Sequence, residues 1–181
     1  MNLPNKLTLL RMALVPVFIA CFYLDAILPW WNYLAAAVMF IASLTDVIDG
    51  RIARSRNLVT NFGKLMDPIA DKLLFCSAFI MLTGRGWLPA IFTVLFIGRE
   101  FIISGFRLVA TNQGTVIAAN WLGKAKTLFQ CIGVLSMLLE NPVFRLINFR
   151  FDLFCMCVAA VFTVWSCLDY ILKNKGAIDL T

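Results

Sequence analysis

The sequence DVIDGRIARSRNLVTNFGKLMDPIAD, residues 46–71, lies between two strongly apolar stretches and contains four aspartates. The first two are three residues apart and the last two are four apart, so each pair occupies one face of a helix. Carboxylates packed together at membrane depth repel one another and lose hydration, so they either take up protons or hold cations between them. Oxygen ligands alone favour a hard divalent ion, and we expect Mg²⁺ or Mn²⁺ at Asp46, Asp49, Asp67 and Asp71.

The composition of the whole chain is that of an integral membrane protein. Of its 181 residues, 61% are hydrophobic and 14% are charged, which is outside the range of soluble globular domains. Six apolar runs each approach the roughly 20 residues that a helix needs to cross a bilayer. They are residues 7–23, 31–52, 65–82, 88–110, 121–139 and 153–172. Because the connectors are short, we expect one all-α membrane domain, residues 1–181, with six transmembrane helices.

Basic residues are distributed unequally between the two ends of these expected spans. If the chain crosses six times, the side with the aspartates carries most of the lysines and arginines. The other side keeps only Arg85, Arg145 and Arg150. The positive-inside rule then places both termini and the aspartates at the cytoplasmic face of the cell membrane. The net charge of +6 suits both anionic lipid headgroups and phosphorylated substrates, and we expect no nucleic-acid partner.

Residues near the aspartates add to the expected site. Gly50 lets a ligand or another backbone approach the second helix closely, and Arg54 offers a planar guanidinium suited to a phosphate. Pro68 suits a first helical turn, where its missing N–H is not needed, so we expect the third helix to begin near it. The chain has no histidine, so a general base would have to be a carboxylate, a lysine or another group.

These residues match a known signature. From Asp46 to Asp71 the chain reads Asp, two residues, Asp-Gly, two residues, Ala-Arg, eight residues, Gly, three residues, Asp, three residues, Asp. This pattern resembles the signature of the CDP-alcohol phosphotransferases at every specified position. Residues 3–8 with Arg11, residues 98–100 and residues 123–127 are similar to the bacterial phosphatidylglycerophosphate synthase branch of that family. The resemblance therefore covers nearly the whole chain.

The resemblance implies a reaction and roles for individual residues. It implies transfer of the phosphatidyl group from CDP-diacylglycerol to glycerol 3-phosphate. It also implies that the enzyme is a homodimer and that two divalent ions take part in the reaction. Asp46, Asp49 and Asp67 would ligate the metal, while Asp71 would be the general base and also touch it. The residues implied for the CDP-lipid site are Asn5, Thr8, Gly50, Arg54 and Thr60. Asn5 has an alternative role as a helix N-cap.

The acceptor must be recognised by basic groups elsewhere. Arg107, Lys124 and Lys126 are expected near the cytoplasmic face and suit the phosphate of glycerol 3-phosphate, although membrane anchors would follow the same pattern. Arg99 and Glu100 lie midway along the fourth run, where an isolated charge costs at least about 2.5 kcal/mol. We expect both to face the protein interior, where a structural ion pair is one interpretation.

Other functions fit part of this pattern. Sister enzymes that use inositol phosphate, serine or phosphatidylglycerol as acceptor would share the aspartates and differ at the acceptor site. A divalent-cation transporter also places carboxylates at membrane depth, but near the midplane with paths to both faces. A structural membrane protein has no need for four aspartates. We therefore predict a transferase with its active site at the cytoplasmic ends of the second and third helices.

Overall fold

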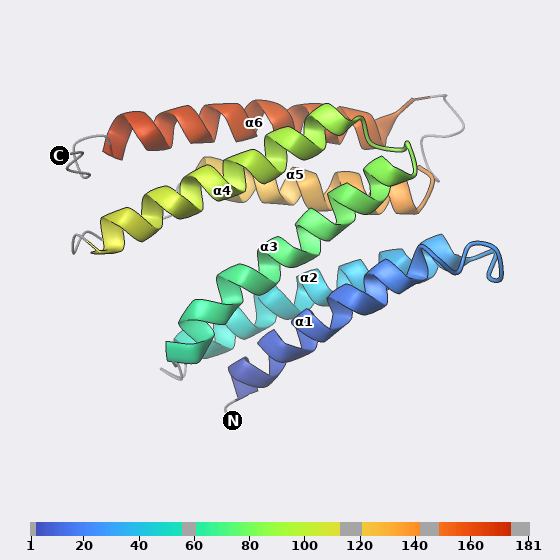
Figure 1. Ribbon diagram of the computed structural model, residues 1–181, viewed down its shortest axis with the longest axis horizontal. Helices are drawn as coiled ribbons and strands as arrows, with labels where there is room; N and C mark the ends of the chain where they lie inside the picture. Colours follow the sequence, from blue (N-terminus) through green and yellow to red (C-terminus); the bar gives the residue numbers. More distant parts are fainter. Residues whose placement is uncertain (1–2, 56–60, 113–120, 142–148, 175–181) are drawn as a thin grey trace.

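In the part of the chain that it describes, the computed structural model consists of six α-helices and their connections (Figure 1). It describes the backbone of residues 3–55, 61–112, 121–141 and 149–174. Within these ranges it also describes the side chains, apart from those of residues 3–7, 46–55, 61–68, 71, 110–112 and 174. Each of the six apolar runs corresponds to a helix, which confirms the predicted all-α class. The helices are α1 (Leu3–Cys21), α2 (Trp31–Ser55), α3 (Asn61–Gly84), α4 (Ala90–Asn112), α5 (Trp121–Leu138) and α6 (Phe151–Asn174).

One expected helix boundary is wrong. α3 begins at Asn61 rather than near Pro68, so the proline is the eighth residue of the helix. A proline in a helix interior removes a backbone hydrogen bond and costs about 3 kcal/mol. α3 packs against both α1 and α4, and tertiary packing of this kind supplies most of a helix's stability in a protein. The packing therefore outweighs the local preference for a helix start at Pro68.

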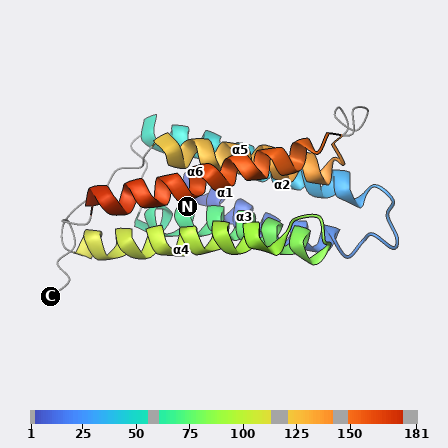
Figure 2. The ribbon, with the colours of Figure 1, turned by 90° about the horizontal axis from the view of Figure 1, so that it is seen from above.

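The six helices form two groups of three. α1 packs against α2 and α3, whereas α6 packs against α4 and α5 and lies between them (Figure 2). Contacts of α2 with α5 and of α3 with α4 join the two groups. Successive helices run in alternating directions, so the end of α2, the start of α3 and the start of α5 all lie toward the left of Figure 1. The aspartate-bearing ends thus share one end of the molecule with the start of α5.

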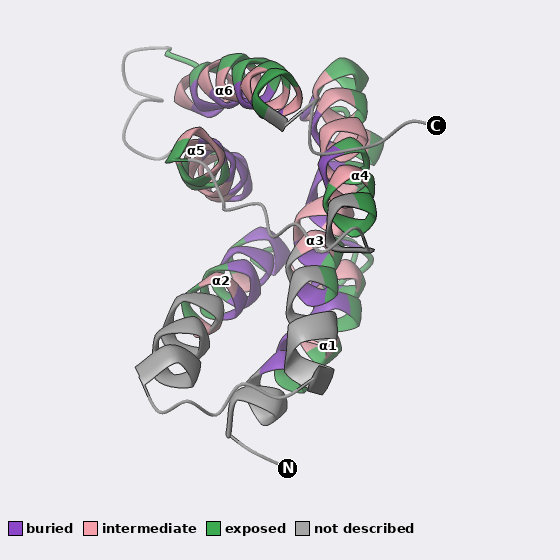
Figure 3. Ribbon diagram, turned by 90° about the vertical axis from the view of Figure 1, so that its left-hand side faces the viewer, coloured by how far each residue is buried: buried purple, intermediate pink, exposed green. Residues whose placement is uncertain are grey.

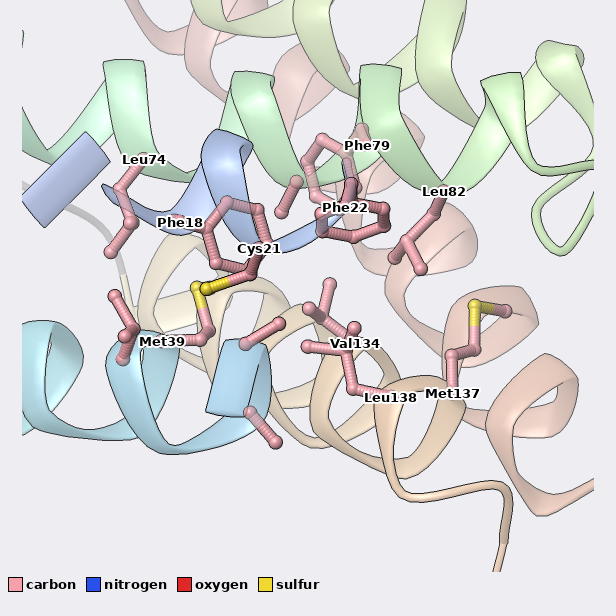
Figure 4. Packing of buried hydrophobic residues seen from close by; sticks show 14 of the residues in the cluster. Phe18, Cys21, Phe22, Met39, Leu74, Phe79, Leu82, Val134, Met137 and Leu138 are labelled. Carbon is pink, nitrogen blue, oxygen red and sulfur yellow. The ribbon is translucent and has the colours of Figure 1, made fainter. Parts of the chain in front are cut away.

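A hydrophobic core joins the two groups (Figure 4). An aromatic chain runs through it from Phe18 to Phe22, Trp31 and Trp87, with ring centroids 5.3, 5.0 and 5.6 Å apart. Such ring pairs contribute about 0.5–1.5 kcal/mol each beyond the area they bury. The α5 residues in the same cluster are Val134, Met137 and Leu138.

Every helix exposes large apolar side chains, and exposed residues lie on the sides of the helices that face away from their neighbours (Figure 3). Soluble monomers rarely expose apolar patches of this extent. In the described part of the chain, one helix is both long and apolar enough to cross a membrane, from Phe151 to Lys173 in α6. Shorter apolar segments are Thr8–Cys21, Trp31–Thr45 and Lys72–Gly84. Crossing by all six helices therefore stays a prediction. The large apolar side chains exposed on the six helices include Val17, Phe40, Ile80, Phe101, Leu128 and Trp165.

An ion pair closes the end of the molecule opposite the aspartates. Nη1 of Arg85 donates to Oδ2 of Asp25 at 2.5 Å, and Nη2 donates to the carbonyl of Phe22. The same guanidinium lies 5.0 Å from the ring centroid of Trp31. These contacts tie the α1–α2 connection to the α3–α4 connection. The hydrogen bond from Arg85 is the main reason why the pKa of Asp25 is below its usual value.

Asp25→Asn should slightly lower the midpoint of thermal unfolding in detergent at pH 7, and this difference from the wild type should disappear below about pH 4. A carboxyl whose pKa is lower in the folded state stabilises the fold above its unfolded pKa, and protonation removes that contribution as the pH falls. Both side chains are partly exposed, so the effect should be small. Circular dichroism melts at several pH values test this, and a difference that stays constant down to pH 3 would contradict it.

Candidate active site

The four aspartates lie on two helices, as the sequence predicts. Asp46 and Asp49 are on α2, and Asp67 and Asp71 are on α3, so helical spacing places each pair on one face. Five residues join the two helices, which limits the separation of the helix ends to about 20 Å. The aspartate side chains lie outside the described residues, and among the described side chains no three metal-binding residues gather. Metal ligation therefore stays a prediction.

Most of the predicted CDP-lipid residues also fall outside the described side chains. Gly50 and Arg54 are on α2 and Asn5 is on α1, while Thr60 lies outside the described residues altogether. α1 begins at Leu3, so Asn5 is its third residue and not its N-cap. Thr8 is described and is only 1% exposed. It lies on the helix that packs against both aspartate-bearing helices.

Arg11 is a candidate that the sequence analysis did not assign to the site. It follows Thr8 by three residues, on the same face of α1, and is 1% exposed. A buried guanidinium needs acidic or polar partners, and α1 packs against the two helices that carry the aspartates. The signal for it in the sequence is a charged residue inside an apolar run.

A second group of charges lies between α4, α5 and α6. Oε1 of Glu100 accepts hydrogen bonds from Nζ of Lys126 on α5 and, at 3.1 Å, from Nη1 of Arg99. Nη2 of Arg99 lies 3.3 Å from Oγ of Ser166 on α6 and donates to it. The side chains of Arg99 and Glu100 are 12% and 24% exposed. The expectation that both face the interior is therefore confirmed, and the two side chains form the ion pair that was one interpretation of the sequence.

Lys72 connects this charge cluster to α3. Its Nζ donates to Oγ of Ser104 on α4 at 2.5 Å, and the Ser104 hydroxyl donates to the backbone carbonyl of Glu100, also at 2.5 Å. Lys72 directly follows Asp71 on α3. Hydrogen bonds through Lys72 and Ser104 therefore connect the helix of the predicted base to Glu100, which pairs with Lys126. Neither Lys72 nor Ser104 was predicted from the sequence, although a lysine inside an apolar run was a usable signal.

The three residues predicted to bind the acceptor phosphate have different surroundings. Lys126 is buried and pairs with Glu100, whereas Lys124 and Arg107 are exposed. The guanidinium of Arg107 lies 5.6 Å from the ring centroid of Tyr170 on α6. The basic side chains near Lys126 are instead those of Arg99 and Lys72, which are both partly buried. Gly123 lies beside the first of them, since a Cβ at this position would be in ordinary van der Waals contact, 3.5 Å, with Nη2 of Arg99.

Comparisons with known proteins all match this chain to one enzyme family. A family model described as CDP-alcohol phosphatidyltransferase matches residues 1–165. A Bacillus subtilis (strain 168) protein named "CDP-diacylglycerol--glycerol-3-phosphate 3-phosphatidyltransferase" is 45% identical, over 98% of this chain and 97% of its own length. Proteins of the same name from Escherichia coli (strain K12) and Salmonella typhi are 37% and 36% identical, each over 97% of this chain and 96% of its own length. These relatives match along nearly their entire sequences.

Proposed function

The chain belongs to the CDP-alcohol phosphatidyltransferase family, and we propose that it transfers the phosphatidyl group of CDP-diacylglycerol to glycerol 3-phosphate. The products are phosphatidylglycerophosphate and CMP. The observation that carries this proposal is 45% identity, over 98% of the chain, to a protein named for this reaction. The chain is therefore an enzyme of phospholipid synthesis.

The enzyme would lie in the cell membrane with all six helices crossing and with both termini and the active site at the cytoplasmic face. Exposed apolar side chains on every helix support contact with lipid. The alternating helix directions bring the basic start of α5 to the same end as the aspartates, in keeping with the positive-inside rule. The net charge of +6 suits an anionic bilayer surface. We propose a homodimer from the family resemblance alone.

Asp46, Asp49, Asp67 and Asp71 would hold two divalent ions, Mg²⁺ or Mn²⁺. A set of carboxylate oxygens suits such hard cations, and two pairs on helices joined by five residues suit a shared site. When bound, the ions would neutralise charge on the pyrophosphate and stabilise the departing CMP.

Asp71 would act as the general base. It takes the proton from the attacking hydroxyl of glycerol 3-phosphate as that oxygen attacks the phosphorus bearing the diacylglycerol. The new O–P bond forms while the bond from this phosphorus to the CMP oxygen breaks, and CMP leaves with the electron pair. This single displacement needs no covalent enzyme intermediate. The residues proposed to line the CDP-lipid site are Asn5, Thr8, Gly50, Arg54 and Thr60.

Lys126 would bind the phosphate of glycerol 3-phosphate. It is buried in the second turn of α5, and a phosphate gains most from a fixed cation where little water competes. Arg107 and Lys124 are exposed on α4 and α5, and their charge would attract the anionic acceptor from solution.

Lys126→Ala should raise the KM for glycerol 3-phosphate by about tenfold and change the KM for CDP-diacylglycerol by less than about twofold. The reason is that the lost charge contacts one substrate only. Steady-state kinetics with each substrate varied in turn would measure both constants. Lys173→Ala is the matched control, because this lysine on α6 is 70% exposed and should leave both constants unchanged. An unchanged acceptor KM in Lys126→Ala would refute the assignment.

The proposed function itself is tested by purified protein with CDP-diacylglycerol and a panel of acceptors. The panel contains glycerol 3-phosphate, inositol phosphate, serine and phosphatidylglycerol, which separate this enzyme from its sister transferases. Release of CMP and the identity of the lipid product are measured for each. We expect turnover with glycerol 3-phosphate alone. Turnover with another acceptor in its place would overturn the assignment of the acceptor.

A further inference from the structure

The carboxylate of Glu100 is shared by cations from two helices. One oxygen, Oε1, accepts from both Lys126 on α5 and Arg99 on α4. A lysine side chain is flexible and has no fixed donor direction, so the position of its ammonium depends on what accepts its hydrogen bonds. The Lys126 side chain is 3% exposed, which leaves water little access as an alternative partner. Glu100 therefore determines where the ammonium of Lys126 lies.

Among the side chains that the structure describes, the surroundings of Glu100 carry more positive than negative charge. Lys72, Arg99 and Lys126 lie around this one carboxylate. In the described part of the chain, Nε of Arg99 is buried and has no hydrogen-bond partner. An excess of positive charge and a buried donor without a partner both favour the binding of an anion. A phosphate monoester, which carries up to two negative charges, would satisfy both.

The backbone of Glu100 is itself held in place. Its carbonyl accepts from Ser104, whose hydroxyl also receives the hydrogen bond from Lys72 on α3. Ser166 on α6 accepts from Arg99 and fixes the second cation. Three neighbouring helices thus contribute hydrogen bonds to α4 at this level. Such a network restricts rotamers more strongly than one exposed ion pair does.

Two roles for Glu100 predict opposite effects on acceptor binding. A residue that only neutralises charge would weaken the attraction for phosphate, so its loss should lower the acceptor KM. A residue that positions the cations would, when lost, leave Lys126 and Arg99 free to move apart, and the acceptor KM should rise. The single oxygen shared by both cations favours the second role, because neutralisation alone does not require a common acceptor atom.

We propose that Glu100 is a positioning residue for the acceptor, holding Lys126 and Arg99 where they bind the phosphate of glycerol 3-phosphate without touching the substrate itself. This inference rests on the proposed function and adds to it a residue that acts through Lys126. The Lys72–Ser104 contact relates this phosphate site to α3, the helix of Asp71.

The test is steady-state kinetics of Glu100→Gln and Glu100→Asp in the full-length enzyme, with each substrate varied in turn. Glu100→Gln should raise the KM for glycerol 3-phosphate about tenfold, the usual effect of weakening one charge-assisted hydrogen bond, with the KM for CDP-diacylglycerol nearly unchanged. Glu100→Asp keeps the charge with a shorter reach, so its acceptor KM should rise about threefold. Asp25→Asn, which removes a carboxylate from the distant pair with Arg85, is the control and should leave both constants unchanged.

A double-mutant cycle with Lys126→Ala separates action through Lys126 from a general effect on the fold. In the Lys126→Ala background, Glu100→Gln should raise the acceptor KM by only about threefold, because the contact with Arg99 alone is left to act. A lowered or unchanged acceptor KM in Glu100→Gln, or full additivity with Lys126→Ala, would overturn the positioning role. If Glu100→Gln does not fold, an unchanged acceptor KM in Glu100→Asp would do the same. Failure of the wild type to use glycerol 3-phosphate would instead overturn the proposed function.

Discussion

Asp71→Asn should reduce turnover about a thousandfold, within the range of about 10²–10⁴ that a positioned general base contributes. Asparagine has nearly the same shape as aspartate but cannot take the proton from the acceptor hydroxyl. Binding of CDP-diacylglycerol should largely persist, because three other aspartates remain to hold the ions at the pyrophosphate. Turnover is measured by CMP release, and binding by equilibrium titration with CDP.

Asp46→Asn is the matched comparison for this variant. Asp46 lies on α2 and Asp71 on α3, and only the second is proposed as the base. Asp46→Asn should therefore weaken metal and CDP binding together, so that part of its activity returns at high Mg²⁺ concentration. Near-wild-type turnover by Asp71→Asn would rule out Asp71 as the base. Equal loss of CDP binding in both variants would argue against separate roles.

Removal of divalent ions should abolish turnover completely. Four aspartates within 26 residues cannot all stay ionised near a pyrophosphate without cations, since each charge repels the others and the substrate. Excess EDTA should reduce CMP release to background, and Mg²⁺ or Mn²⁺ added beyond the chelator should restore it. EDTA already saturated with Mg²⁺ is the control for effects of the chelator on the detergent micelle.

Turnover without divalent ions would contradict the proposed mechanism. Full CMP release in excess EDTA, raised no further by added Mg²⁺, would exclude the metal-assisted displacement. Such a result would leave the family membership unaffected, because that depends on the match over residues 1–165. It would instead require that the aspartates bind substrate in protonated form.

The helices were predictable because each coincides with an apolar run between short connectors. The start of α3 was not predictable in this way. Pro68 indicates a helix start nearby, yet the helix begins seven residues earlier, at Asn61. Local preferences of this size, about 3 kcal/mol for a proline, are outweighed when a helix packs against two neighbours. Periodicity and apolar length thus predicted which segments are helical better than proline position predicted where they begin.

The acceptor site was harder to predict for a different reason. Arg107, Lys124 and Lys126 look alike in sequence as basic residues near helix ends, yet only Lys126 among them is buried. Its partner Glu100 is 26 residues away in the chain, and a single sequence contains no information on which distant charges meet. Lys72, which reaches α4 through Ser104, was missed because it lies beside the more conspicuous aspartates.

The division of the helices into two groups has a consequence for how the reaction is controlled. The proposed base and metal ligands belong to α2 and α3, whereas Lys126 and Arg99 belong to α5 and α4. The reacting oxygen and the phosphorus would then be presented by different structural units, and their separation would depend on how these units pack against each other. Polar contacts cross this boundary at several levels in the described residues, among them Lys72 with Ser104, Thr83 with Thr93 at 2.6 Å and Cys131 with Ser43 at 3.8 Å. Membrane thickness or lateral pressure that shifts one unit would act directly on the geometry of catalysis.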